Sequence, residues 1–179
     1  MSHHSVAEIY AFMDEARRRL EQRVVNLTPT QQRFKTSADA WCIGEVTEHL
    51  ALIEERLSRT IAAAVKRASV AEGYHRASFA PVSLDRFAEQ AARKLEAPEM
   101  VRPGGLASIS DSLAKMRDSR ATLAGLRPQV EVRDFSAVIF PHPLFGPLNI
   151  YEWLVTIGLH EERHLKQIEN IIAAPDFPS

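Results

Sequence analysis

The sequence predicts an all-α protein, a four-helix bundle with long crossover loops. First, four segments repeat apolar residues at alternating steps of three and four, which places these residues on one face of a helix. Second, almost no segment alternates apolar and polar residues as a half-buried strand does. Third, 179 residues without an internal repeat suit one hydrophobic core. Residues 1–179 are therefore expected to form a single domain.

The first helix is expected from Ser5 to about Asn26, with Ser5 and Glu8 forming a capping box at its start. Its inner side consists of Ile9, Met13, Ala16, Leu20 and Val24. The run Arg17–Arg19 lies among acidic residues, which favours a solvated charged face over a basic binding patch. Residues 28–40 have few periodic apolar positions and predict a connection with one short turn.

The second helix is expected from Ile43 to about Arg67. Its inner side consists of Val46, His49 or Leu50, Ile53, Leu57, Thr60 or Ile61, and Ala64. His49 follows Val46 by three residues and precedes Ile53 by four, so its imidazole is expected to face inward. Residues 68–82 predict an extended crossing loop with His75 exposed, and Leu84–Glu96 predict a short helix.

The third long helix is expected to begin after Gly105 and to end near Gly125 and Pro128. Its buried side consists of Leu106, Ile109, Leu113, Met116, Arg120 and Leu123. Arg120 on this stripe can hold an anionic substrate or pair with an acidic side chain, and the structural role is the favoured interpretation.

The segment from Gln129 to Leu148 is expected to be irregular, with a brief extended piece at Val138–Phe140. His142 lies between two prolines and is interpreted as a loop or capping residue rather than a ligand. Asn149 is expected to cap the last helix, which Pro175 ends.

Two histidines occupy core positions of the last helix. Its inner side consists of Ile150, Trp153, Ile157, His160, His164, Gln167 and Ile171. His160 and His164 are four residues apart, so they lie one above the other and can bind one divalent cation at about 2.0–2.1 Å. His49 is the natural third ligand. Three histidines leave coordination positions open, which is typical of a catalytic rather than a structural site.

Residues 160–164 (HEERH) also match the zinc-peptidase pattern H-E-x-x-H, in which the glutamate activates water. Where its metzincin extension has glycine and histidine, however, this chain has Gln167 and Asn170, and the peptidase hypothesis has no use for His49. Glu45 and Glu161 are possible proton acceptors, but ordinary helix-surface carboxylates are the favoured interpretation.

The composition of the chain argues against several classes of function. The net charge of −1 gives no general basic field, so nucleic acid is not an expected partner. The single cysteine, Cys42, excludes an intramolecular disulfide, suits a reducing cytoplasm and is not expected to be a nucleophile. No signal peptide and no run of about 20 apolar residues is present, so no membrane span is expected.

Three blocks of this sequence resemble the DinB superfamily, which includes the YfiT-like branch and thiol-dependent transferases. They are residues 41–56 (WCIGEVTEHLALIEER), 142–154 (HPLFGPLNIYEWL) and 160–168 (HEERHLKQI). The resemblance implies an up-down-down-up bundle in which one histidine of the second helix and an H-x3-H pair of the fourth hold a divalent ion. In this chain these residues are His49, His160 and His164.

The resemblance also implies a function. It suggests a cytoplasmic homodimer that binds nickel, zinc or another divalent ion and acts on a small molecule, as a transferase of a low-molecular-weight thiol such as bacillithiol, mycothiol or glutathione, or as a thiol-dependent isomerase of maleylpyruvate. A metal-dependent hydrolase and a non-catalytic bundle that binds a metal or small ligand are the alternatives. No catalytic residue is assigned.

Overall fold

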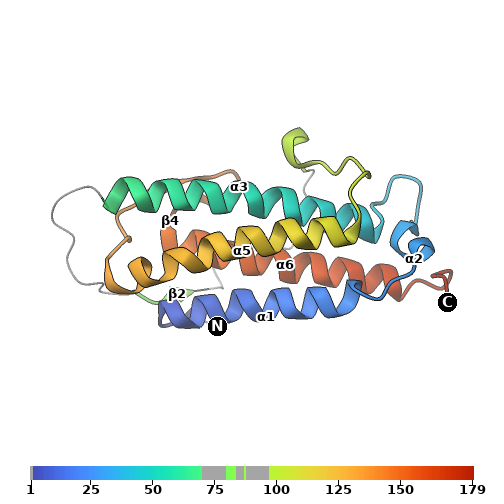
Figure 1. Ribbon diagram of the computed structural model, residues 1–179, viewed down its shortest axis with the longest axis horizontal. Helices are drawn as coiled ribbons and strands as arrows, with labels where there is room; N and C mark the ends of the chain where they lie inside the picture. The colour runs from blue at the N-terminus through green and yellow to red at the C-terminus, as the bar shows by residue number, and fades with distance from the viewer. Residues whose placement is uncertain (1, 70–79, 84–86, 88–96) are drawn as a thin grey trace.

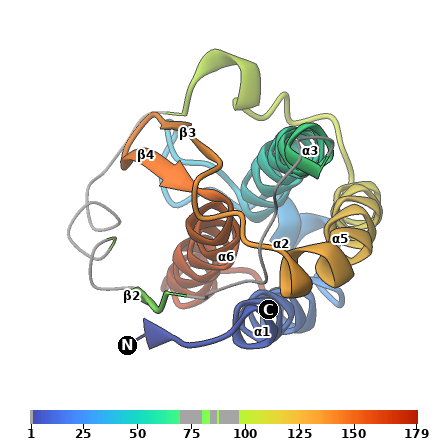
Figure 2. The ribbon, with the colours of Figure 1, turned by 90° about the vertical axis from the view of Figure 1, so that its left-hand side faces the viewer.

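The computed structural model describes residues 2–69, 80–83, 87 and 97–179. Within these residues, four long helices lie side by side (Figures 1 and 2): α1 (Val6–Val24), α3 (Ile43–Ser69), α5 (Ile109–Val132) and α6 (Ile150–Ile172). Helices α1 and α6 run in one direction and α3 and α5 in the other (Figure 1), and α1 and α3 each pack against both α5 and α6. The predicted all-α, up-down-down-up four-helix bundle is confirmed.

Short elements connect the long helices. Helix α2 (Pro29–Arg33) is the short turn expected after α1, and a 3-10 helix, η1 (Glu99–Val101), precedes α5. Strand β1 (Ser2–His3) pairs antiparallel with β2 (Val82–Ser83), and β3 (Ile139–His142) pairs with β4 (Gly146–Asn149) in a hairpin that leads into α6. The expected exposure of His75 and the expected helix at 84–96 lie outside the described residues, apart from the buried Phe87.

Side-chain caps explain where the helices begin. Asn149 caps α6, as the sequence predicts, and Glu152 completes a reciprocal capping box with it. Ser5 caps α1 by accepting the N–H of Glu8, but the Glu8 carboxylate accepts the N–H of His4 rather than that of Ser5. The predicted box at Ser5 is therefore only half formed.

Helix α5 differs from the prediction at both ends. It begins at Ile109, with Leu106 93% exposed before it, and it continues through Pro128 to Val132. A proline in a helix removes one backbone hydrogen bond, but the next turn buries Val130 completely, and this burial offsets the loss. The segment expected to be irregular thus begins with a helical turn and ends with the β3–β4 hairpin.

The core consists of two apolar clusters on either side of a charged layer. One cluster packs the N-terminal half of α1 against Ile61, Leu123 and Leu154, and the other packs the C-terminal half of α1 against Leu50, Leu113 and Ile168. Between them lies a group that we call the ionic layer: Asp14, Arg17, Glu54, Arg120 and Glu161.

The ionic layer links all four long helices. Arg17 pairs with Glu54 and Glu161, and Arg120 lies 3.0 Å from Asp14, 3.2 Å from Glu54 and 3.3 Å from Glu161. Arg120 thus pairs with acidic side chains, which is its favoured interpretation. The expected solvated face was right for Arg18 but wrong for Arg17, which is only 7% exposed.

The interpretation of Glu161 as a surface carboxylate was also wrong, because Glu161 is only 2% exposed. Burial raises the pKa of its carboxyl above the ordinary range, although the positive charges of the neighbouring Arg17 and Arg120 act to lower this pKa.

Candidate metal centre

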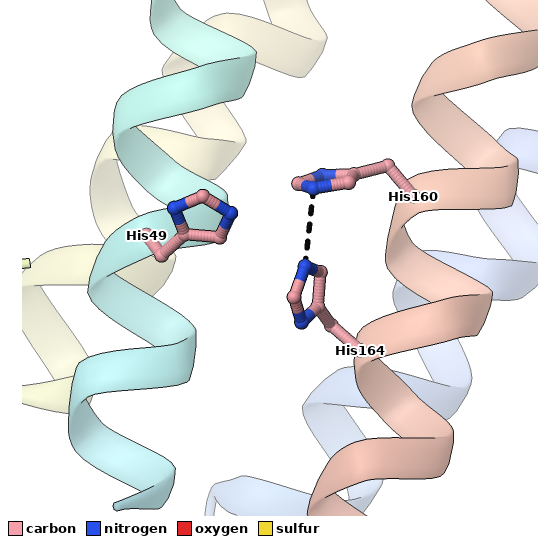
Figure 3. A group of neighbouring side chains, drawn as sticks. All are labelled: His49, His160 and His164. Carbon is pink, nitrogen blue, oxygen red and sulfur yellow. Dashed lines mark hydrogen bonds between the residues drawn. The ribbon is translucent and has the colours of Figure 1, made fainter. Parts of the chain in front are cut away.

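Helices α3 and α6 bring together the three histidines that the sequence singles out. His49 projects from α3 toward His160 and His164, which lie one turn apart on α6 (Figure 3). One nitrogen of each ring lies within 4.8 Å of a nitrogen of the other two. Among the described residues, no other group of three or more histidine, cysteine or acidic side chains converges in this way. Their role as metal ligands stays a prediction.

The spacing of the pair on α6 suits one shared ion. Nε2 of His160 and Nε2 of His164 are 3.1 Å apart. Two nitrogens bound at about 2.0–2.1 Å to the same ion lie roughly 2.9 Å apart at a right angle and roughly 3.4 Å apart at the tetrahedral angle. The observed separation falls between these values, so the pair requires little movement to bind one cation.

Hydrogen bonds fix which ring nitrogen is free in two of the histidines. Nδ1 of His49 lies 2.8 Å from the carbonyl oxygen of Val101, and Nδ1 of His164 lies 2.8 Å from the side-chain oxygen of Gln167. Because both oxygens only accept, each Nδ1 carries the proton and each Nε2 keeps its lone pair. Outer hydrogen bonds of this kind are usual around histidine ligands.

Burial favours the neutral form of all three imidazoles. Burial lowers the pKa of His49, lowers that of His164 to about 4, and lowers that of His160 well below its ordinary value, where the neighbouring rings add to the effect. Neutral imidazole is the form that binds metals. In the structure Nε2 of His160 and Nε2 of His164 share a hydrogen bond, and an ion bound between the rings would take the place of its proton. Three imidazoles are a donor set that fits a divalent ion.

The structure argues against the peptidase alternative. That mechanism requires the glutamate after the first histidine to reach water on the metal. Glu161 instead pairs with Arg17 and Arg120 in the ionic layer. Glu161, which the H-E-x-x-H pattern requires as a base, is therefore paired with arginines instead of serving the histidines.

The other candidates have structural contacts. Glu45 accepts the N–H of Cys42 at 2.8 Å and pairs with Lys35, so it holds the start of α3. Cys42 is buried, which raises the pKa of its thiol and disfavours a nucleophilic role. Nδ1 of His142 accepts the N–H groups of Leu144 and Phe145 at 3.1 and 3.3 Å, as expected of a capping residue.

Sequence reasoning missed three neighbours of the histidines. Trp41 packs its ring 4.9 Å from that of His49, and the Val101 carbonyl belongs to η1, which no spacing rule connects to α3. Gln167 could have been found, because it follows His164 by three residues on the same stripe and can therefore reach it.

Comparisons with known proteins agree with this architecture. A family model of the DinB superfamily matches residues 13–168. Uncharacterized protein YuaE of Bacillus subtilis (strain 168) is 28% identical over 162 residues, which cover 90% of this chain and 95% of that protein. The crystal structure of TT2238, a four-helix bundle protein, superposes with a TM-score of 0.60 at 21% identity, covering 91% of this chain and 96% of that one. This last likeness concerns the fold alone. Among the described helices, none has the length and apolar character required to span a membrane.

Proposed function

The chain belongs to the DinB superfamily, and from this premise we propose that it is a divalent-metal protein in which His49, His160 and His164 bind one ion. The observation that carries the proposal is the convergence of three imidazoles from two helices, with nitrogens within 4.8 Å of one another. Nickel and zinc are the first candidates, since both accept imidazole nitrogen.

We further propose that the protein is a metal-dependent enzyme that transfers a low-molecular-weight thiol. When bound, the ion would supply the positive charge that lowers the pKa of a thiol and favours the nucleophilic thiolate. The chain's own residues would hold the three imidazoles in place and shield them from bulk water. Cys42 is buried with a raised thiol pKa, so the reacting thiol is expected to come from a small co-substrate. The proposal includes a cytoplasmic homodimer with a small-molecule substrate.

The metal assignment is tested by elemental analysis of the chain purified without a metal-affinity step. We expect close to one divalent ion per native chain and loss of most of it in His49→Ala. The matched control is His4→Ala, which removes an exposed imidazole outside the cluster and should leave the metal content unchanged. Equal metal retention by native protein and His49→Ala would remove His49 from the site.

The reaction is tested separately on metal-loaded protein. Native chain and His164→Ala are assayed with small thiols paired with electrophiles, and with a panel of hydrolase substrates. Thiol transfer by the native chain alone supports the transferase. Turnover only of hydrolase substrates would favour the hydrolase, and a loaded protein without turnover would favour the non-catalytic binding bundle.

A further inference from the structure

A short segment before α5, from Val101 at the end of η1 to Gly105, holds His49 at the ring nitrogen that does not face the other histidines, and we call this segment the loop. The carbonyl oxygen of Val101 accepts the Nδ1 proton of His49 at 2.8 Å, and both residues are buried. Since a neutral imidazole carries one ring proton, this hydrogen bond leaves the lone pair on Nε2. The position of the loop therefore decides which nitrogen His49 offers to an ion.

The same loop is fastened to α3 by Glu48, the residue before His49. Oε2 of Glu48 accepts the backbone N–H of Gly105 at 2.8 Å. Gly105 has a φ of +71°, in the left-handed region that favours glycine, which turns its N–H toward α3. Gly104 lies near the same carboxylate, since a Cβ added there would be 3.6 Å from Oε1 of Glu48. The loop is thus tied to α3 at His49 and again at Glu48.

We propose that Glu48 is a positioning residue of the metal centre. By fastening Gly105, it keeps the Val101 carbonyl on Nδ1 of His49 and so keeps Nε2 directed toward His160 and His164. The inference rests on the proposed function, because it concerns how one of the three ligands is held. Removing an outer partner of a histidine ligand typically lowers metal affinity by about 10–100-fold.

The carboxylate of Glu48 could also raise metal affinity through its negative charge alone, and three substitutions separate the two effects. Glu48→Gln keeps an acceptor oxygen at the same reach without the charge. Glu48→Asp keeps the charge, but its side chain is one methylene shorter and does not reach Gly105. Glu48→Ala removes both. The matched control is Glu55→Ala, another half-buried glutamate of α3, which pairs with Arg59 instead of the loop.

The measurement is the affinity of the metal-free full chain for Ni²⁺ and for Zn²⁺, by competition with a chromogenic chelator. Glu48→Ala and Glu48→Asp should lose about 10–100-fold, whereas Glu48→Gln and Glu55→Ala should stay close to native. The reverse order for Gln and Asp would assign the effect to charge and overturn the proposal. Unchanged affinity in every variant would overturn it while leaving the metal site intact. A native chain that binds no ion would instead reject the proposed function itself, and this inference with it.

A second readout does not depend on the metal. Nitrogen NMR of the metal-free protein should show the proton of His49 on Nδ1 in the native chain and in Glu48→Gln, and a shift toward the Nε2-protonated form in Glu48→Asp and Glu48→Ala. An unchanged proton position in folded Glu48→Asp would contradict the proposal. Melting curves verify that each variant is folded, and the Gln and Asp pair carries the test if Glu48→Ala does not fold.

Discussion

Gln167 is a single residue that contacts one of the proposed metal ligands. Its side-chain oxygen accepts the Nδ1 proton of His164 at 2.8 Å. We expect Gln167→Leu, which removes the acceptor at similar size, to lower metal affinity by about 10-fold or more. Chelator competition measures the loss. Gln167→Glu retains an acceptor oxygen and is the control, and equal affinities for the Leu variant and the native chain would exclude this role.

Gly158 is a residue whose absent side chain matters. An added Cβ would lie 2.7 Å from Cδ1 of Phe12, whose ring also packs against His3. Gly158→Ala is therefore expected to destabilise the fold by about 1–3 kcal/mol. Gly125→Ala is the matched helical control, because an added Cβ there meets nothing within 4 Å and should stabilise α5 by about 0.5–1 kcal/mol. Urea unfolding measures both, and equal effects would contradict the packing argument.

Individual residues differ in how far the sequence reveals them. His160 and His164 are apparent because a spacing of four within an apolar stripe places both on one inner face, and His49 follows from its own stripe. Arg17 is not apparent, because it stands in a run of three arginines and its burial depends on Glu54 and Glu161 from other helices. Local spacing reveals a face, whereas the partners of a buried charge come from the assembled bundle.

At the scale of elements, the β3–β4 hairpin was the part of the fold that the sequence predicted least. Its strands have four residues each and include Pro141 and Pro147, which weaken any strand pattern. Tertiary contacts stabilise the hairpin: Phe140 stacks on Trp153 of α6 at 4.6 Å, and its carbonyl accepts the indole N–H. The extension of α5 past Pro128 has the same explanation, because burial of Val130 outweighs local propensity.

The hairpin turn is expected to weaken in acid. Its cap requires neutral His142, and burial lowers the pKa of His142 to about 4 from an ordinary 6.5. An opened turn takes up a proton near pH 6.5 and the closed turn only near pH 4, so the cap's full stabilisation is present above pH 6.5 and declines between these values.

Hydrogen exchange of the Leu144 and Phe145 amides, corrected for intrinsic rates, measures this decline. In His142→Asn the side-chain oxygen can accept the same N–H groups at any pH, so its protection should stay constant. A pH-independent native turn would contradict the expectation.

At the scale of the whole molecule, the ion pairs of the ionic layer are expected to fix the positions of the four long helices along the bundle axis relative to one another. Arg17→Met leaves Glu54 and Glu161 buried with one guanidinium fewer, which is expected to cost about 3–5 kcal/mol. The exposed neighbour Arg18→Met should change stability by less than about 0.5 kcal/mol. Arg17→Met combined with Glu54→Met restores charge balance and should recover part of the loss. Urea unfolding, monitored by circular dichroism, measures the free energy of unfolding of each variant. Similar losses for Arg17→Met and Arg18→Met would contradict the stabilising role of the ionic layer.

The ionic layer has a consequence for hydration. The ionic layer lies in the middle of the bundle, between the two apolar clusters. On α6, Glu161 of this layer directly follows His160. Charged and imidazole groups lose little when solvent wets them, whereas the leucines and isoleucines on either side lose a great deal. Without a cation, the middle of the bundle, at the ionic layer and the histidines, is expected to open to water before the apolar ends of the bundle unfold.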